Sequence, residues 1–458
     1  MITIRILKFI IILLLTILMV TVLSACASAP EDSYGAEPGG TYAGTNEVGY
    51  ETELSDSLED LEISAGIGES FHTGLPHGYI AVDFIRHMND NFPGRSPFTY
   101  REQETAVWIV EELLAMGHNP DNIEVQEFTF DELVEREIGS LLVPDWDFVS
   151  NPLILGAERL YLLRQDRGSQ NVILTLPGQS DRKIIVGAHY DSVPYPGASD
   201  NASGTALLLE SSLRMLEIDH YHTIVYVFFG AEEVGLFGAY YYYESLTAEE
   251  HANVVMMINA DILIDGPYII YGAGTASGFA EDTFEAIVDS VVLSIVEEFL
   301  EESDDVFQDT DIEEWAIALA EHFAANPTLT LVQGFMEGLV DAEVTDASLQ
   351  VDALALELSE THGLELLAIP EGIAFTSDNL VFFMSHTVVN LIGLERVENI
   401  DGVRIPMGLQ VHPDFAATIL HTPYDEFDKI EYLWPGMMLA NMNAFSLFLE
   451  AILSAVFS

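Results

Sequence analysis

Residues 184–191 read IIVGAHYD, an apolar β-rich run that ends in a histidine and an aspartate. Two later stretches have the same form: residues 223–233 read TIVYVFFGAEE, and residues 254–261 read VVMMINAD. Continuous apolar runs of this length are typical of strands buried on both faces of a parallel sheet. Charged residues rarely belong to such buried runs, so the pattern predicts a sheet whose strand ends carry polar chemistry.

Stretches with helical or strand character surround these three runs. Helices are predicted over residues 102–116, 203–216 and 235–246, and further strands over residues 123–130, 171–176, 365–369 and 388–392. Strands that alternate with helices indicate an α/β fold, with a mostly parallel mixed sheet flanked by helices on both faces. Right-handed crossovers then place the carboxyl ends of the strands at one edge. A mostly helical, acidic insertion is expected at about 278–364, and a final helix at 430–457 is expected to pack on the sheet.

The composition excludes several classes of protein. The 458 residues hold 75 Asp+Glu against 15 Lys+Arg, a formal net charge of −60, yet 49% of the residues are hydrophobic, enough for a folded core. Nucleic-acid binding needs a basic surface, so DNA and RNA are excluded as partners. The single cysteine, Cys26, excludes disulfide scaffolds and cysteine-based zinc sites. Any metal must therefore be held by His, Asp and Glu.

The amino terminus predicts export. Residues 1–26 have a positive start (Arg5 and Lys8), an uncharged apolar run, and the sequence LSAC that ends in Cys26. This resembles the lipobox of bacterial lipoproteins, which implies cleavage before Cys26 and attachment of lipid to its thiol. The alternative is an uncleaved membrane anchor. In both cases the rest of the chain lies outside the cytoplasm: residues 27–75 as a flexible acidic linker, and residues 76–458 as the folded domain.

The three strand ends and one loop together predict a metal centre. The strands lead into His189, Glu232 with Glu233, and Asp261, while Asp200 lies among small residues in ASDNASG at 198–204. Two divalent cations about 3.5–4 Å apart need a bridging carboxylate with flanking histidine and carboxylate ligands. The chemistry also needs a carboxylate that is not a ligand, to accept a proton. Adjacent Glu232 and Glu233 offer one of each.

The order of these motifs resembles the zinc aminopeptidases of peptidase family M28. The matching stretches are GAHYDS at 187–192, SDNASG at 199–204, AEEVGLFG at 231–238, NAD at 259–261 and LHTPYD at 420–425, with PGR at 93–95 as a weaker match. The resemblance extends from about residue 79 to the carboxyl terminus. It implies the zinc aminopeptidase (phosphorylase/hydrolase-like) fold.

The resemblance also implies the roles of particular residues. One zinc would be bound by His189, Asp200 and Asp261, and the second by Asp200, Glu233 and His421. Asp191 would hydrogen-bond His189 and fix its tautomer. Glu232 would be the general base, and later the general acid toward the leaving amine. Two Zn²⁺ ions are expected, although cobalt or manganese could replace them, and no organic cofactor is expected. In the family the peptide bond after the bridging aspartate is often cis, which is expected at Asp200–Asn201.

The implied function is a membrane-anchored, extracytoplasmic aminopeptidase that removes amino-terminal residues from peptides with a free amino terminus. Three alternatives remain. The fold also hosts carboxypeptidases, for which Arg396 and Arg404 could hold the substrate carboxylate, and single-zinc glutaminyl cyclases. The third alternative is a catalytically silent binding lipoprotein.

Two residues depart from the family pattern, and some histidines need a separate interpretation. Asn379 stands where relatives often have histidine, and Leu420 where several have an oxyanion-stabilising tyrosine. His412 competes with His421 as a ligand but lacks the following Thr-Pro-x-Asp pattern. His220 and His222 precede a strand and are expected to face solvent.

Overall fold

The computed structural model describes residues 74–129, 168–275, 344–368, 377–383, 385–394, 397–400, 403–406, 419 and 421–457. All of them belong to one compact unit, formed by Glu62–Asp289 and Gly334–Ser458. The predicted signal, most of the predicted linker and most of the predicted acidic insertion lie outside these residues. Cys26, Arg396, His412 and Leu420 lie outside them as well, as does the side chain of Arg404.

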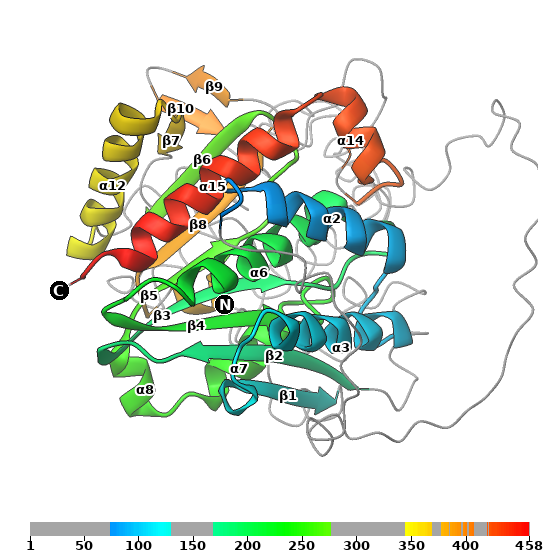
Figure 1. The fold of residues 1–458 in the computed structure, drawn as a ribbon, viewed down its shortest axis with the longest axis horizontal. Helices are drawn as coiled ribbons and strands as arrows, with labels where there is room; N and C mark the ends of the chain where they lie inside the picture. Colours follow the sequence, from blue (N-terminus) through cyan, green and yellow to red (C-terminus); the bar gives the residue numbers. More distant parts are fainter. Residues whose placement is uncertain are drawn as a thin grey trace, which may run out of the picture. The chain divides into compact units, whose positions relative to one another are not determined.

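An eight-stranded mixed sheet forms the centre of the fold, in the order β1-β2-β4-β3-β5-β8-β6-β7 (Figure 1). Its strands are β1 (Ile123–Thr129), β2 (Gly168–Leu176), β3 (Ser180–His189), β4 (His222–Phe229), β5 (Val254–Ala260), β6 (Tyr268–Gly274), β7 (Leu366–Ala368) and β8 (Val388–Leu394). Neighbouring strands are parallel from β4 through β3 and β5 to β8 and between β6 and β7, while β1–β2, β2–β4 and β6–β8 are antiparallel. The predicted mostly parallel mixed sheet is confirmed. Two short strands, β9 (Val397–Ile400) and β10 (Val403–Pro406), form a separate antiparallel pair.

The four central strands carry the site because they point in one direction. His189 at the end of β3 lies opposite Phe229 at the end of β4, and Gly187 lies opposite Asn259 of β5. From β3 the chain continues to β4 on one side of it, and then crosses to β5 on the other side. The order of strands therefore reverses beside β3, and ligands of open α/β sheets bind in the crevice at such a switch point.

Helices cover both faces of the sheet. In Figure 1, α2, α3, α6 and α15 lie in front of it. On the other face, α7 and α13 pack on alternate strand residues such as Ile185, Val227 and Met257. The helices are α2 (Tyr79–Asn91), α3 (Tyr100–Ala115), α6 (Ser203–Met215), α7 (Phe237–Ser245), α8 (Ala248–Asn253), α12 (Asp346–His362), α13 (Asn379–Phe383), α14 (Phe427–Leu433) and α15 (Met437–Ser454), with short turns η3 (Pro120–Asn122) and η5 (Ala198–Ala202).

Local sequence explains where the helices begin and end. The Thr99 hydroxyl caps α3 by accepting a hydrogen bond from the amide of Glu102, and Gly117, at φ 94°, follows its end. In α12, Thr345 and Ser348 form a reciprocal cap, and Gly363 ends the helix at φ 68°. This helix lies within the segment expected to be helical.

Two expectations are wrong. The single helix predicted over residues 430–457 is two helices, α14 and α15, because Pro435 lacks an amide hydrogen and Gly436 adopts φ 80°. Of the two histidines expected to face solvent, His222 is fully buried, and its Nε2 accepts a hydrogen bond from the amide of Phe457 at the end of the chain. Nothing local to β4 indicates that the carboxyl terminus covers its first residue.

Helix α15 packs on the sheet as predicted. Phe448 meets Tyr271 of β6 edge to face, with ring centroids 5.1 Å apart. Among the described residues, this helix alone has the length and apolar composition of a membrane span, and 61% of it is buried inside the fold. Such burial is typical of a core helix, since its apolar side chains pack against the sheet and the other helices and not against lipid.

Candidate metal centre

The predicted ligands of the first cation lie together where β3 and β5 end. His189 Nε2 is 3.1 Å from Asp200 Oδ1 and 3.4 Å from Asp261 Oδ1. All three residues are buried. His189 is the last residue of β3, Asp261 follows β5, and Asp200 lies on the loop between β3 and α6. The parallel register of β3 and β5 thus brings two of these side chains together, and the loop supplies the third.

The predicted ligands of the second cation meet at the other oxygen of the same aspartate. His421 Nε2 is 3.0 Å from Asp200 Oδ2 and 3.3 Å from Glu233 Oε2. The His421 backbone is left-handed, at φ 56°, and 43% of its side chain is exposed. Asp200 therefore faces a histidine with each of its two oxygens, which is the disposition that a bridging carboxylate requires.

The loop that carries Asp200 is fixed by the residues after it. The Asp200–Asn201 peptide bond is cis, as expected. The Asn201 side chain donates to the carbonyl of Ala260 at 2.9 Å and accepts from the amide of Gly204 at 2.8 Å. A Cβ at Gly204 would lie 2.1 Å from the Ala260 carbonyl oxygen, so only glycine allows the start of α6 to approach β5 this closely.

The chemistry of these side chains fits divalent cations. One ligand atom each from His189, Asp200 and Glu233 lies within 4.8 Å of the others. Asp261 Oδ1 is buried and accepts no hydrogen bond from any described residue. Imidazole nitrogen and carboxylate oxygen are the donors that Zn²⁺ takes in hydrolytic sites. Buried carboxylates at this spacing repel one another unless cations lie between them.

The ionisation of the site follows from its buried charges. Burial alone would lower the pKa of His421, but the carboxylates of Glu233 and Asp200 raise it to about 11. Burial likewise opposes protonation of His189, yet Glu232 and Asp261 raise its pKa well above the ordinary value. In the metal-free chain each imidazolium therefore supplies part of the positive charge that the carboxylates need, and cations that bind there displace those protons.

Asp191 lies close to its predicted position but makes different contacts. Its Oδ1 is 3.6 Å from His189 Nδ1, too far for a hydrogen bond, and Nδ1 donates instead to the Asp191 backbone carbonyl at 3.2 Å. Because Nδ1 keeps its proton for that carbonyl, Nε2 is the nitrogen that would lose its proton and bind a cation. The Asp191 carboxylate accepts from the amides of Glu232 and Glu233, each at 3.1 Å.

Glu232 lies beside the cluster with its carboxylate uncommitted. No described residue makes a hydrogen bond to that carboxylate, whereas Glu233 Oε1 accepts from the amide of Val193 at 3.1 Å. Burial raises the pKa of Glu232 well above its ordinary value, although His189 opposes this rise. The nearby carboxylates of Glu233, Asp378 and Asp261 add to the rise. Bound cations would oppose this rise. The two adjacent glutamates therefore differ in environment.

A buried glutamate that the sequence reasoning missed holds the same turn. Glu102 of α3 is fully buried, and its Oε1 accepts from the hydroxyl of Ser169 at 2.7 Å and from the amide of Ala231 at 3.0 Å. Together with Asp191 it fixes three successive amides, those of residues 231–233. A sequence signal existed: Glu102 lies on the helix face of Ala106, which is the apolar face of α3.

Asp378 and Asn379 are also buried beside the cluster. Both carboxylate oxygens of Asp378, and both polar side-chain atoms of Asn379, have no hydrogen-bond partner among the described residues. Burial raises the pKa of Asp378 well above its ordinary value. His189 opposes this rise, and the carboxylate of Asp261 adds to it. The structure thus brings the segment in which Asn379 departs from the family pattern close to the predicted ligands.

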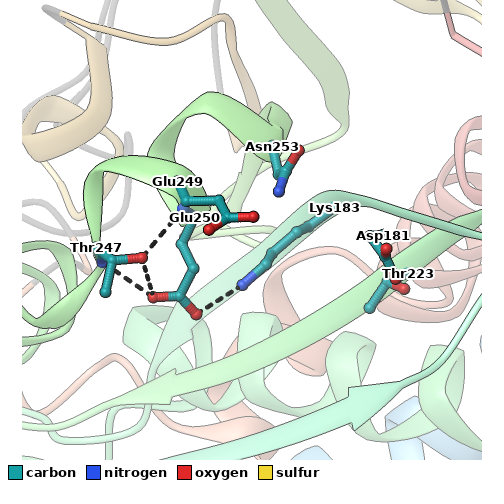
Figure 2. A pocket seen from close by; sticks show the side chains of 7 residues that line it. All are labelled: Asp181, Lys183, Thr223, Thr247, Glu249, Glu250 and Asn253. Atoms are coloured by element: carbon teal, nitrogen blue, oxygen red, sulfur yellow. Dashed lines mark hydrogen bonds and ion pairs between the residues drawn. The ribbon is translucent and has the colours of Figure 1, made fainter.

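A polar depression lies at the opposite ends of the strands, away from the cluster. Figure 2 shows Lys183, near the start of β3, directed at Glu250 of α8, with Nζ and Oε1 3.1 Å apart. The depression is lined by Asp181, Lys183, Thr223, Thr247, Glu249, Glu250 and Asn253. Glu250 also accepts from the amide and hydroxyl of Thr247, as part of the cap of α8. Lys183, Thr247 and Glu250 therefore satisfy one another as part of the fold, and the carboxyl-end cluster is the candidate site.

The fold and the cluster define a class of protein: an α/β domain whose strand ends hold histidines and carboxylates arranged for two adjacent divalent cations. Residues 171–326 match the sequence model of Peptidase family M28. This matched stretch is about a third of the chain, and it holds every predicted metal ligand except His421.

Individual relatives and structures are similar to parts of the chain. The "Probable lipoprotein aminopeptidase LpqL" of Mycobacterium tuberculosis is 40% identical over 218 residues, 42% of this chain and 43% of that protein. An "Aminopeptidase" of Pseudomonas aeruginosa is 32% identical over 272 residues, 56% of this chain and 49% of that protein. The structure of a zinc aminopeptidase from Bacillus subtilis is matched with 15% identity and a TM-score of 0.46, over 81% of this chain and 94% of that one. The chain spans about half or less of the length of these curated relatives.

Proposed function

We propose that the protein is a metallo-aminopeptidase that uses two Zn²⁺ ions, with Glu232 as its general base. One observation carries this proposal: the two oxygens of Asp200 face His189 and His421, each of which is also close to a second carboxylate. A bridging carboxylate between two such sets of ligands is the arrangement of co-catalytic metal pairs.

The protein side chains would divide the work as follows. His189, Asp200 and Asp261 would hold one ion, and Asp200, Glu233 and His421 the other. When bound, the ions would polarise the scissile carbonyl and lower the pKa of water. Glu232, whose carboxylate has no hydrogen bond from a described residue, would accept a proton from the attacking water and return it to the leaving amine. Asp191 and Glu102 would hold the turn that carries Glu232.

Cleavage at a free amino terminus is supported by the relatives, because the matched curated proteins bear the name aminopeptidase. A carboxypeptidase would need a cation for the substrate carboxylate. Arg95, the buried arginine below the cluster, has its guanidinium engaged by the carbonyls of Tyr190, Pro196 and Gly197. It is therefore not available for that purpose, while Arg396 and the side chain of Arg404 lie outside the described residues.

We further propose that residues 1–26 are a lipoprotein signal, that residues 27–75 are a linker, and that residues 76–458 form the peptidase domain, anchored outside the cytoplasm through lipid on Cys26. Support comes from the sequence before Cys26 and from the printed name of the M. tuberculosis relative. Expression of the full chain in a bacterium fed radiolabelled palmitate tests the anchor. We expect label in the wild type and none in Cys26→Ser; equal labelling of both would contradict it.

The enzymatic proposal is tested with the purified full chain, loaded with zinc, on aminoacyl-arylamides, on amino-blocked peptides and on peptides with amino-terminal glutamine. We expect hydrolysis of the free-amine substrates, loss of that hydrolysis with a chelator, and recovery when zinc is restored. Glu232→Gln should lower kcat by about 10²–10⁴-fold, the usual contribution of a positioned base, with two zinc ions still bound. Glu249→Gln, an exposed glutamate at the opposite strand ends, is the matched control.

Each other outcome has a distinct meaning. Turnover confined to amino-blocked substrates would overturn the aminopeptidase in favour of a carboxypeptidase. Cyclisation of amino-terminal glutamine without hydrolysis would favour a cyclase. Binding of zinc with no turnover of any of the substrates would favour a binding lipoprotein.

A further inference from the structure

The loop between β3 and α6 carries Asp200, and one of its sides is held by Arg95. This arginine is fully buried. Its Nε donates to the carbonyl of Tyr190, Nη1 donates to that of Pro196 at 2.6 Å, and Nη2 donates to that of Gly197 at 2.7 Å. The three donors of one planar guanidinium thus reach carbonyls spread over eight residues, and so fix the path of the loop.

The other side of the loop is held by Asp425. Its Oδ1 accepts from the amide of Ser199 at 2.6 Å, and its Oδ2 accepts from the amide of Asp200 at 3.0 Å. Its backbone carbonyl accepts from the amide of Ala198 at 3.3 Å. Three successive amides, the last of them that of the bridging residue itself, therefore end on Asp425. Since His421 lies four residues earlier, Asp425 also ties the His421 loop to the Asp200 loop.

We propose that Arg95 and Asp425, together the loop clamp, are positioning residues that hold the Asp200 carboxylate so that each oxygen faces its own cation. This inference rests on the proposed two-metal centre. Neither residue is a ligand in that centre. Carbonyls on one side of the loop are satisfied by a buried cation, and amides on the other side by a buried anion, so the backbone cannot rotate Asp200 without breaking several buried hydrogen bonds.

The charge of Arg95 makes the proposal testable by the sign of an effect. Burial lowers the pKa of Arg95 to about 10, against the charges of the carboxylates of Asp425, Asp191, Asp200 and Glu233, and the guanidinium stays protonated at neutral pH. A fixed cation near a metal centre opposes the binding of further cations. If charge were its main contribution, removing that charge would tighten zinc binding. The loop clamp predicts the opposite, because a misplaced Asp200 weakens the binding of both ions.

Geometry explains why lysine cannot replace Arg95. A lysine ammonium is a single point, whereas three separated carbonyls are bound by three different guanidinium nitrogens. The loop also passes close to the guanidinium: a Cβ on Gly197, at φ +62°, would lie 3.1 Å from Arg95 Nη2 and 2.4 Å from the Asp200 carbonyl oxygen. The fit between arginine and loop is therefore tight, and a lysine would leave at least one buried carbonyl without a donor.

The experiment compares Arg95→Gln and Arg95→Lys with the wild type, as full chains. Zinc dissociation constants are measured by competition with a chromophoric chelator, and the visible spectrum of the cobalt-substituted protein reports ligand geometry. We expect both variants to bind zinc about 10–100-fold more weakly, the usual cost of losing the support of a ligand, with an altered cobalt spectrum. Arg214→Lys is the matched control. It changes another buried arginine, which bonds Glu210 and the carbonyls of Leu75 and Pro76, and it should lower stability without changing zinc affinity.

Asp425→Asn keeps one of the two side-chain acceptors and provides a milder second test if the Arg95 variants do not fold. We expect about 10-fold weaker zinc binding for it. Unchanged or tighter zinc binding in folded Arg95→Gln, full rescue by Arg95→Lys, or unchanged binding in Asp425→Asn would each overturn the loop clamp alone. Failure of the wild type to bind zinc would instead overturn the metal centre, and the loop clamp with it.

Discussion

Asp191→Asn replaces a buried carboxylate that accepts two amide hydrogen bonds with a side chain that can accept only one of them. The two donors are the amides of Glu232 and Glu233, each 3.1 Å from a carboxylate oxygen. One amide would bond the neutral asparagine oxygen in place of a charged carboxylate oxygen, at a cost of about 1 kcal/mol. The other amide would face the asparagine NH₂ group, which is itself a donor, at a cost of about 1–3 kcal/mol. We therefore expect the free energy of unfolding to fall by about 3 kcal/mol.

The same change should displace the proposed base. These two amides belong to the backbone that carries the Glu232 and Glu233 side chains. A shift of this turn therefore moves Glu232 relative to the metal centre. Misplacement by about 1 Å costs on the order of 10²-fold in rate, so kcat on an aminoacyl-arylamide should fall by about 10–100-fold with little change in KM. Guanidinium denaturation followed by circular dichroism measures the stability, and steady-state kinetics with measured zinc content measures the rate.

The control is Asp352→Asn, at an exposed aspartate of α12 that accepts from the hydroxyl of Tyr271 at 2.8 Å. An asparagine oxygen can still accept that bond, so we expect less than about 1 kcal/mol of lost stability and unchanged kcat. The reasoning about Asp191 would be refuted if Asp191→Asn kept kcat within about twofold of the wild type and lost less than about 0.5 kcal/mol. Its carboxylate would then not hold the turn.

Three further outcomes are expected. Gly204→Ala should destabilise the chain and abolish zinc binding, because the added Cβ would lie 2.1 Å from the Ala260 carbonyl oxygen; normal calorimetric zinc binding would contradict this. Glu210→Ala removes a fully buried carboxylate that bonds Arg214 Nε at 2.8 Å, and denaturation should show about 3–5 kcal/mol of lost stability, whereas a loss under about 1 kcal/mol would be incompatible with a buried ion pair. Burial lowers the pKa of His118 to about 4 from its ordinary 6.5, so below pH 6.5 the unfolded chain takes up a proton that the folded chain excludes, and stability is lost as pH falls. The free energy of unfolding of the metal-free wild type should therefore fall by about 2 kcal/mol through this residue between pH 8 and pH 5. Denaturation of His118→Gln should not show this part of the loss. An equal pH dependence in both proteins would disprove the prediction.

Particular elements show how far the sequence alone can lead. Runs such as residues 223–229 are so apolar that few structures other than a buried strand can hold them, and β4 matches that run closely. Strand β6 (Tyr268–Gly274) was not predicted, because its glycines and half-exposed residues give no clear alternation. The final helix was predicted too long, since the break at Pro435 and Gly436 was not recognised in an otherwise apolar stretch.

Contacts between distant residues were beyond the reach of sequence patterns. The sequence indicated that Asp191 belongs near the site, but that its carboxylate accepts from the amides of Glu232 and Glu233 depends on where β3 and β4 end relative to each other. Glu102 contacts an amide 129 residues away in the chain, and Asp425 contacts one 225 residues away. No local propensity encodes such pairings.

The sequence by itself determined the class of sheet, the residue types available for metal binding, and the positions of the candidate ligands at strand ends. It could do so because strand periodicity and residue chemistry are local properties. Tertiary structure alone decided which oxygen faces which histidine, how Asp200 is held between Arg95 and Asp425, and which of the two adjacent glutamates keeps a carboxylate free of hydrogen bonds from the described residues. Those features depend on differences of an ångström between segments far apart in the chain, which only the packed fold can fix.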